Sequence, residues 1–175
     1  MNIINRFTLR TILGLSLILP MSSIHAEVTK EDKVKAAIVF KMTKFITWPQ
    51  KKQTLTLCII GDGSINSELK KINRKFSLGR RISVTHKAHT APLEKLCELI
   101  YIHNADNKTT QAILNKLKNT PVLTISDIEQ FAEQGGVIGL YRTGSRIRFA
   151  INRGSAKNSK LSISSQLLDL AKIVE

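Results

Sequence analysis

Three histidines and one glutamate are the side chains in this sequence whose types best suit metal binding. His86, His89 and His103 could converge with Glu94 on one ion. The spacing of His86 and His89 suits two ligands only on a helix or a suitable loop. The alternative is that these histidines are separate surface side chains, which is what we expect. The sequence therefore predicts no metal site and no cofactor.

The stretch Gly61-Asp62-Gly63-Ser64 could bind a phosphate, because it lies between an apolar run and a helical pattern. It matches neither GxGxxG nor GxxxxGK[ST], so we interpret it as an ordinary connecting loop. Ser164 and Ser165 begin another helical pattern, where serine usually acts as a cap. The chain has no GxSxG and no carboxylate pair that stands out. We therefore expect a protein that is not an enzyme.

The first 26 residues predict export. Arg6 and Arg10 precede an apolar run at 11–20, which is too short for a membrane span of roughly 20 residues. The small residue Ala26 ends the pattern of a signal peptide. We expect cleavage after Ala26, which leaves a single periplasmic domain of residues 27–175. The alternative is an uncleaved membrane anchor.

Cys58 and Cys97 both lie in the exported part of the chain. An even number of cysteines in an oxidising compartment predicts one disulfide, Cys58–Cys97. The chain has no CxxC, so a thioredoxin-type redox enzyme is not indicated.

The mature chain is strongly basic. The sequence has 27 Lys and Arg against 13 Asp and Glu, and only Arg6 and Arg10 precede residue 27, so residues 27–175 carry a net charge of +12. Export argues against nucleic acid as the partner. An anionic lipid, an acidic cell-wall polymer or an acidic protein face fits better. Because the basic residues are scattered, a merely solvated surface is the alternative.

Strand and helix patterns alternate along the chain, which predicts an α/β fold: a mostly parallel sheet with helices on both faces and an antiparallel C-terminal hairpin at its edge. We expect the strand order 2-1-3-4, with the hairpin at the far edge. The expected strands are 54–60, 81–85, 97–103 and 121–126, and the hairpin is 137–142 with 146–152. The expected helices are 29–47, 64–74, 106–119, 128–134 and 162–174.

The first helix has apolar residues on more than one side. A helical wheel predicts a core stripe of Val34, Ile38, Met42 and Phe45, flanked by Val39 and Ile46, with Ala36 and Phe40 on another side. Phe40 is then either an isolated exposed ring or part of a second interface. Trp48 is expected to pack the end of the helix against the sheet, and Pro49 to end the helix.

Several short phrases together resemble one protein family. The phrases are Lys35-Ala36-Ala37, Lys44-Phe45-Ile46-x-Trp48-Pro49, Cys58 before Gly61-Asp62, Gly79-Arg80, Cys97 before Tyr101-Ile102, 123–127 before Gly135-Gly136, and 146–152 before 164–168. In this order they resemble the YfiR family of small periplasmic α/β proteins, over essentially the whole mature chain. Some members carry a second cysteine pair, which this chain lacks.

The resemblance implies a regulator rather than a catalyst. It implies that the protein represses an inner-membrane diguanylate cyclase by binding its periplasmic domain, which lowers cyclic-di-GMP and biofilm formation. It also implies sequestration by an OmpA-type outer-membrane lipoprotein, and a homodimer. The alternative function is a small-ligand- or metal-binding protein that uses the carboxyl edge of the sheet.

Four residues are candidates for binding a protein partner. Phe40 is the aromatic residue away from the expected core stripe, and Lys44 lies beside it. Arg146 and Arg148 alternate within the last strand, so they share one face while Ile147 and Phe149 face the other side. Their guanidinium groups could donate paired hydrogen bonds to acidic groups.

Overall fold

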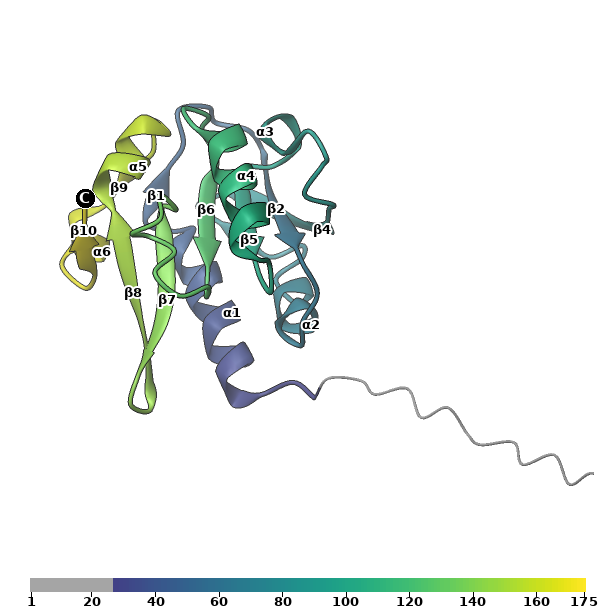
Figure 1. The fold of residues 1–175 in the computed structure, drawn as a ribbon. Helices are drawn as coiled ribbons and strands as arrows, with labels where there is room; N and C mark the ends of the chain where they lie inside the picture. The colour runs from purple at the N-terminus through teal and green to yellow at the C-terminus, as the bar shows by residue number, and fades with distance from the viewer. Residues whose placement is uncertain (1–26) are drawn as a thin grey trace, which may run out of the picture.

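The computed structural model describes residues 27–175 (Figure 1). The predicted signal peptide lies outside the described residues. No helix within 27–175 is both long enough and apolar enough to cross a membrane. The chain folds as an α/β protein, with a mostly parallel sheet between two layers of helices and an antiparallel hairpin, as the sequence predicts.

Six helices and ten strands make up this part of the chain. The helices are α1 (Lys30–Met42), α2 (Ile65–Lys70), α3 (Leu93–Leu96), α4 (Asn107–Leu117), α5 (Arg153–Asn158) and α6 (Ser165–Leu168). The strands are β1 (Ile46–Thr47), β2 (Thr54–Ile60), β3 (Phe76–Ser77), β4 (Arg80–His86), β5 (Leu99–Ile102), β6 (Leu123–Ser126), β7 (Ile138–Thr143), β8 (Arg146–Asn152), β9 (Ser162–Ile163) and β10 (Lys172–Val174).

The predicted strand order is confirmed. The large sheet has the order β10-β8-β7-β6-β5-β2-β4-β3, and β4, β2, β5 and β6 are the four predicted parallel strands. The hairpin β7–β8 follows β6. Two short strands that the sequence analysis missed, β3 and β10, extend the sheet at its edges, so the hairpin is not the outermost element.

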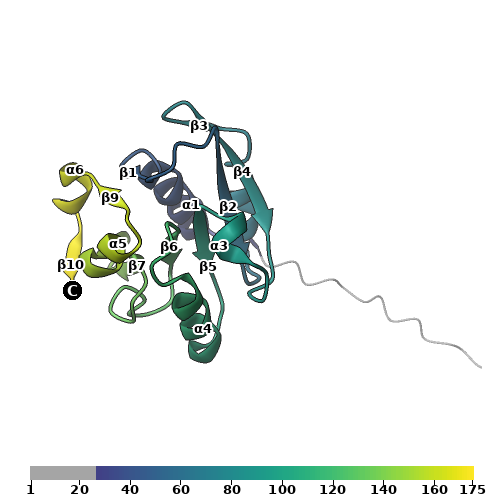
Figure 2. The same ribbon diagram turned by 90° about the horizontal axis from the view of Figure 1, so that it is seen from above.

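Both faces of the central strands are buried, which explains why these strands are almost continuously apolar. Leu57 and Ile59 of β2 belong to the core beneath α1 and α2, whereas Cys58 and Ile60 belong to the core beneath α3 and α4. Figure 2 shows α1 and α4 on opposite sides of the strands.

The predicted disulfide is confirmed. Cys58 and Cys97 are bonded, and their Cα atoms are 5.8 Å apart. Cys58 lies within β2, and Cys97 ends α3 just before β5, which pairs with β2. The bond therefore links the end of α3 covalently to β2, a central strand of the sheet.

Helix α1 begins as predicted and ends earlier. Thr29 and Asp32 form a reciprocal capping box at its start. The helix ends at Met42, because residues 43–45 turn the chain into β1, which pairs with β9. Trp48 is buried as expected, and its indole N–H donates to the backbone carbonyl of Glu98 at 2.9 Å.

The predicted core stripe of α1 is confirmed in part: Met42 is buried and Ile38 and Phe45 pack against the core, but Val34 does not. Ala36, Val39 and Met42 are the buried apolar residues of the helix, whereas Val34 is 40% exposed. The reason is that the helix is oriented by its polar residues. The Asp32 side chain is also buried, and it accepts a hydrogen bond from Ser64 at the start of α2. The small residue Ala36, rather than Val34, therefore faces the sheet.

Two predicted helices do not form. Residues 128–134 make successive turns, and Gln130 has a positive φ of 54°, which an α-helix excludes. Residues 162–174 divide into β9, α6 and β10. Ile163 pairs with Ile46, and Ile173 pairs with Ile151, so strand pairing overrides the helical period of this segment.

Candidate functional site

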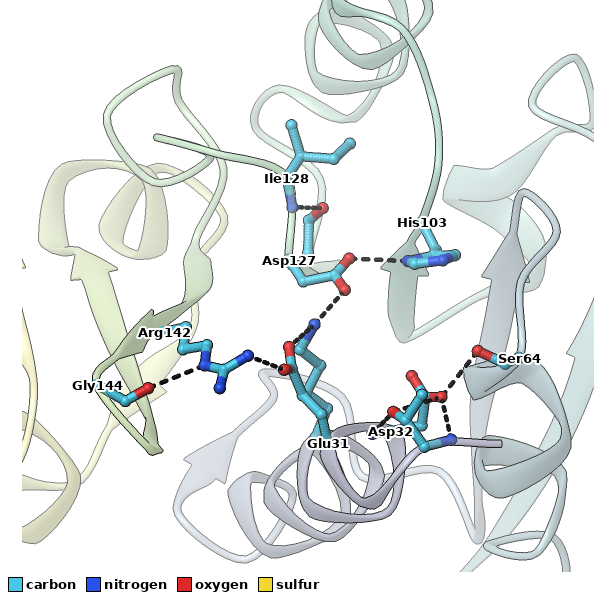
Figure 3. Close-up of polar contacts among 11 residues, drawn as sticks. Glu31, Asp32, Ser64, His103, Asp127, Ile128, Arg142 and Gly144 are labelled. Atoms are coloured by element: carbon cyan, nitrogen blue, oxygen red, sulfur yellow. Dashed lines mark hydrogen bonds and ion pairs between the residues drawn. The ribbon is translucent and has the colours of Figure 1, made fainter. Parts of the chain in front are cut away.

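A polar network lies at the carboxyl end of the parallel strands, where open α/β sheets place their sites. Asp127 follows β6 and His103 follows β5, and the Asp127 carboxylate lies 2.9 Å from His103 Nδ1. The other carboxylate oxygen accepts a hydrogen bond of 2.7 Å from Lys35 Nζ, which comes from α1 (Figure 3). The network therefore joins two strand ends to the first turns of α1.

The same network continues to the tip of the hairpin. Lys35 Nζ also contacts Glu31 Oε1 at 2.7 Å, and Glu31 Oε2 lies 3.4 Å from the guanidinium of Arg142 on β7. The Arg142 Nε donates to the Gly144 carbonyl at the hairpin turn (Figure 3). Charged groups thus connect β5, β6, α1 and the β7–β8 hairpin in one chain of contacts.

Burial makes the central contacts of this network strong. The Lys35 side chain is 13% exposed and that of Asp127 is 10% exposed. Burial alone would raise the pKa of Asp127, but hydrogen bonds from His103 and Lys35 outweigh it and lower the pKa to about 2. The hydrogen bond to Asp127 raises the pKa of His103 above its ordinary value. Asp127 is therefore the ionised centre of the network.

The loop after β2 is shaped to receive His103. A Cβ atom on Gly63 would lie 2.3 Å from the His103 ring, and one on Gly61 would lie 1.8 Å from the His103 carbonyl oxygen. Gly61 also has a positive φ of 87°. The two glycines of this connecting loop thus permit the close approach of His103. Ser64 directs its hydroxyl to Asp32 rather than capping α2.

Tyr101 lies directly behind this network. It is fully buried, its ring stacks on that of His103 with centroids 6.4 Å apart, and its hydroxyl has no hydrogen-bond partner among residues 27–175. Burial, and after it the nearby Asp127 carboxylate, raises the pKa of Tyr101 far above its ordinary value, so the hydroxyl is protonated and points toward the same anion as His103 and Lys35. An unpaired buried hydroxyl is a donor that a small bound molecule could satisfy.

The His103–Asp127 pair resembles the part of a catalytic triad that orients a general base. A triad also needs a nucleophile within hydrogen-bond reach of the histidine. The nearby Ser64 hydroxyl instead donates to Asp32 at 2.7 Å. Ser164, the other serine considered above, accepts a hydrogen bond from the Leu167 N–H as the cap of α6. Neither serine is placed as a nucleophile for His103.

The histidines considered for metal binding have different partners. His86 Nε2 lies 3.1 Å from the Gly61 carbonyl and 3.5 Å from Asp62, whereas His103 contacts Asp127. Glu94 lies 4.0 Å from Lys116 Nζ. Among residues 27–175, no three His, Cys, Asp or Glu side chains are placed to hold a metal ion.

Phe40 is half-buried rather than an isolated exposed ring. It packs against the core under α1, and the ammonium groups of Lys44 and Lys75 lie 5.3 Å and 5.4 Å from its centroid. These are cation–π distances. Its role in binding a partner stays a prediction, as does that of Lys44.

Arg146 and Arg148 lie as their alternation predicts. Both are exposed on β8, while Ile147 and Phe149 are half-buried and pack toward the core. Next to them is a groove of about 830 Å³ between the start of α1 and the hairpin, which Lys30 and Arg142 also line. The structure brings the two arginines together on one edge, far along the chain from Phe40 and Lys44.

Lys35, Asp127, Glu31 and Arg142 are not among the site residues that the sequence predicts, although they form one network. One signal was present, because His103 and Asp127 each follow directly after an apolar strand that ends at the same edge of the sheet. The two residues on α1 could not be assigned, because the predicted stripe turns Val34, rather than Ala36, toward the core.

Comparison with known proteins identifies the family. The sequence profile of YfiR/HmsC-like proteins matches residues 32–172. The chain belongs to the YfiR/HmsC-like family. The resemblance described from the sequence is thereby confirmed. Membership supports a periplasmic regulatory role in cyclic-di-GMP signalling in general, and proteins of the YfiR/HmsC-like family are regulators rather than catalysts.

Two solved structures are similar in fold. A conserved domain protein from Vibrio cholerae O1 biovar El Tor has a TM-score of 0.56 at 8% identity, covering 82% of this chain and 60% of that one. An ABC domain in complex with L-Trp, from Streptococcus pneumoniae, has a TM-score of 0.59 at 13% identity, covering 80% of this chain and 60% of that one. This chain therefore spans about three fifths of the length of the two proteins. The similarity to them is in the α/β fold.

Proposed function

We propose that this protein is a periplasmic, non-catalytic regulator that binds the periplasmic domain of an inner-membrane diguanylate cyclase and represses it. Repression lowers cyclic-di-GMP and biofilm formation. The observation that carries the proposal is the match of the YfiR/HmsC-like profile to residues 32–172, which covers most of the chain. The predicted signal peptide at 1–26 supports the compartment.

The charge distribution supports a protein partner with an acidic face. Residues 27–175 carry a net charge of +12. Lys30, Arg142, Arg146 and Arg148 line one groove, with Glu31 as its acidic residue. Charge complementarity of this kind speeds association and fixes the orientation of the partner. We propose Arg146 and Arg148 as contacts with a protein partner at this groove. We propose Phe40 and Lys44, near the end of α1, as contacts at a second place on the surface.

Two further assemblies belong to the proposal. The protein forms a homodimer, and an OmpA-type outer-membrane lipoprotein sequesters it and so releases the cyclase. Phe40 is the residue that we assign to the dimer.

Deletion of the gene tests the proposal. Cyclic-di-GMP and surface attachment should rise in the deletion strain and return to the starting level when the full-length gene is restored. Capture of the tagged mature protein on solubilised inner membranes should retain a protein with a diguanylate cyclase domain. Unchanged cyclic-di-GMP in a deletion strain that carries the cognate cyclase would reject the repressor role.

A small-ligand-binding function is the second candidate. The unpaired hydroxyl of Tyr101 favours it, because this donor is buried behind a polar network at the strand ends. A ligand that binds only the folded state raises its melting temperature. A thermal-shift screen of periplasmic metabolites, repeated on Tyr101→Phe, tests this function. A shift that the wild type shows and the variant lacks would support it.

A further inference from the structure

One segment of the sheet has an open edge. Strand β8 pairs with β7 from Arg146 to Ile151. On its other side, β10 pairs only with Ala150, Ile151 and Asn152. Within the described chain, β10 reaches no further along β8 than this, so residues 146–148 pair with β7 alone. In Figure 1 the lower half of the hairpin extends past β10.

The hairpin turn determines which backbone groups point outward. Thr143 pairs with Arg146 across the two-residue loop Gly144-Ser145, and Gly144 has a positive φ of 58°, as the first position of a type II′ turn requires. The pair that closes such a loop is hydrogen-bonded, and hydrogen-bonded pairs then alternate with non-bonded ones. Ile147 and Phe149 therefore direct their N–H and C=O groups away from β7. The register of Ala150 with Lys172 makes the Phe149 carbonyl an acceptor for β10, which leaves the Ile147 N–H and C=O and the Phe149 N–H at the open edge.

The charge beside this edge is positive. Arg146 and Arg148 are exposed on β8, and Lys30 and Arg142 line the adjoining groove. Within residues 27–175, neither Arg146 nor Arg148 forms an ion pair, whereas Arg142 contacts Glu31. A segment that adds to this edge therefore meets unpaired backbone groups in the plane of the sheet and unpaired guanidinium groups on one face.

A second copy of the chain does not suit the edge. If two β8 edges pair antiparallel about a twofold axis that passes through a residue, Arg146 lies opposite Arg148, and like charges directly opposite are destabilising. If the axis passes between two residues, the face that carries the arginines in one copy joins the face that packs on the core in the other copy. Ile147 and Phe149 of each copy then lie beside charged rather than apolar side chains. A strand with acidic residues at alternate positions avoids both problems.

We propose that an extended, acidic segment of a partner protein adds as a strand to the edge of β8 at residues 146–149. Ile147 and Phe149 supply the backbone hydrogen bonds, and Arg146 and Arg148 bind the acidic side chains of the segment. This inference rests on the proposed function, because it describes how the membrane partner is held. Strand addition of this kind combines main-chain affinity with side-chain specificity.

The first test uses the mature protein and a capped decapeptide of alternating Glu and Thr. Binding of this peptide should shift and protect the backbone amides of Ile147 and Phe149 in NMR hydrogen exchange. The same peptide with alternate amides N-methylated keeps its charge but cannot form the ladder, and it should not bind. Equal binding of the methylated peptide, or protection confined to other parts of the chain, would overturn the proposal.

A pair of variants at one position provides a matched control. Ile147→Pro removes the outward N–H, whereas Ile147→Ala keeps it and loses a similar amount of packing. The proline variant should bind the Glu-Thr peptide about tenfold more weakly than the alanine variant, since a main-chain hydrogen bond is lost. Circular dichroism checks that both variants fold. Equal affinities in two folded variants would contradict strand addition.

The two proposals can fail separately. If deletion of the gene raises cyclic-di-GMP but Ile147→Pro restores repression as fully as Ile147→Ala, the strand addition is wrong and the repressor role stands. If deletion has no effect, the repressor role is wrong whatever the peptide shows. Vesicles of phosphatidylglycerol distinguish a lipid from a protein: binding of the vesicles by Ile147→Pro, together with no binding of the Glu-Thr peptide by the wild type, would assign this edge to the membrane and overturn the proposal.

Discussion

Lys35 and Asp127 lie 92 residues apart in the sequence, and their side chains meet at 2.7 Å. Lys35 lies on the first helix and Asp127 directly after β6. Their contact and the bond from Asp127 to His103 hold α1 to two strand ends of the sheet. Because each of the two side chains is nearly buried, this contact should matter to stability far more than an exposed ion pair.

Asp127→Asn should therefore destabilise the protein by about 3 kcal/mol, because it leaves Lys35 and His103 without their shared anion. We choose the lower end of the usual range, since Lys35 keeps its contact with Glu31. Urea denaturation measures the change. Asp62→Asn, whose side chain is 95% exposed, is the matched control and should lie close to the wild type. A similar loss of unfolding free energy in the two variants would contradict the role of Asp127 in holding α1 to the sheet.

The stability that His103 contributes should depend on pH in a defined direction. Its pKa is raised in the folded protein, so its contribution is fully present below the unfolded pKa of about 6.5 and is lost as pH rises through the higher folded pKa. The pKa of Asp127 is about 2, so Asp127 stays ionised throughout this window. The free energy of unfolding of wild type minus that of His103→Gln should fall between pH 5 and pH 9.

Urea titrations at several pH values measure that difference, and His89→Gln controls for the removal of a histidine in general. A difference between wild type and His103→Gln that stays constant, or that grows as pH rises, would contradict the assigned ion pair.

The parts of the fold that the sequence predicts are those set by local pattern and by chain connection. The runs at 57–60 and 99–102 are apolar throughout, which is typical of a strand covered on both faces, and the crossover rule then orders the parallel strands. The hairpin follows from alternation around Gly144. These features depend on neighbours in sequence, so they can be predicted without coordinates.

The features that could not be predicted depend on distant contacts. The C-terminal segment has a helical period, yet Ile163 and Ile173 form strands because Ile46 and Ile151 offer them partners. The orientation of α1 is set by Asp32 and Lys35, which bind Ser64 and Asp127 from other elements. A helical wheel that ranks only apolar residues cannot include such bonds. The sequence therefore predicts neither the side of α1 that faces the sheet at Asp32 and Lys35 nor the network around Asp127.

The Cys58–Cys97 bond should be a main source of stability. Its sequence separation is 39 residues, for which the chain-entropy estimate is about 4 kcal/mol. Both sulfur-bearing residues are buried in the core beneath α3 and α4, so replacement by alanine adds a small cavity. Cys58→Ala with Cys97→Ala should lower the urea midpoint strongly, and dithiothreitol should lower the midpoint of the wild type alone. A wild type whose midpoint does not respond to full reduction would contradict this role.

Phe40→Ala should weaken self-association. The ring is half-buried beneath Lys44 and Lys75, so its loss should also destabilise the monomer by about 2 kcal/mol, which is less than for a fully buried phenylalanine. Analytical ultracentrifugation measures the mass, and Phe76→Ala, which removes a ring that is 65% exposed on β3, is the control. A dimer that survives Phe40→Ala but is lost in Phe76→Ala would place the interface at β3 instead.

Arg146→Glu with Arg148→Glu should weaken the complex with the membrane partner and raise cyclic-di-GMP. Both side chains are exposed on one face of β8, and neither is paired within residues 27–175, so the free protein should lose little stability. In the complex, the acidic groups of the partner that face positions 146 and 148 would be repelled rather than bound. Truncating one member of a desolvated charge pair costs about 2–5 kcal/mol, and reversing the charge should cost at least as much.

Lys108→Glu with Lys118→Glu makes the same change in net charge on the α4 side of the sheet, and both lysines are exposed. This control distinguishes a contact at β8 from a general effect of charge. The wild-type complex should also weaken as salt is raised, because exposed charges at the rim of an interface are screened over about 10 Å at 0.1 M. The β8 variant should lose most of that salt dependence and the α4 variant should keep it. If the α4 variant loses repression as fully as the β8 variant, the net charge of the protein, rather than Arg146 and Arg148, determines binding.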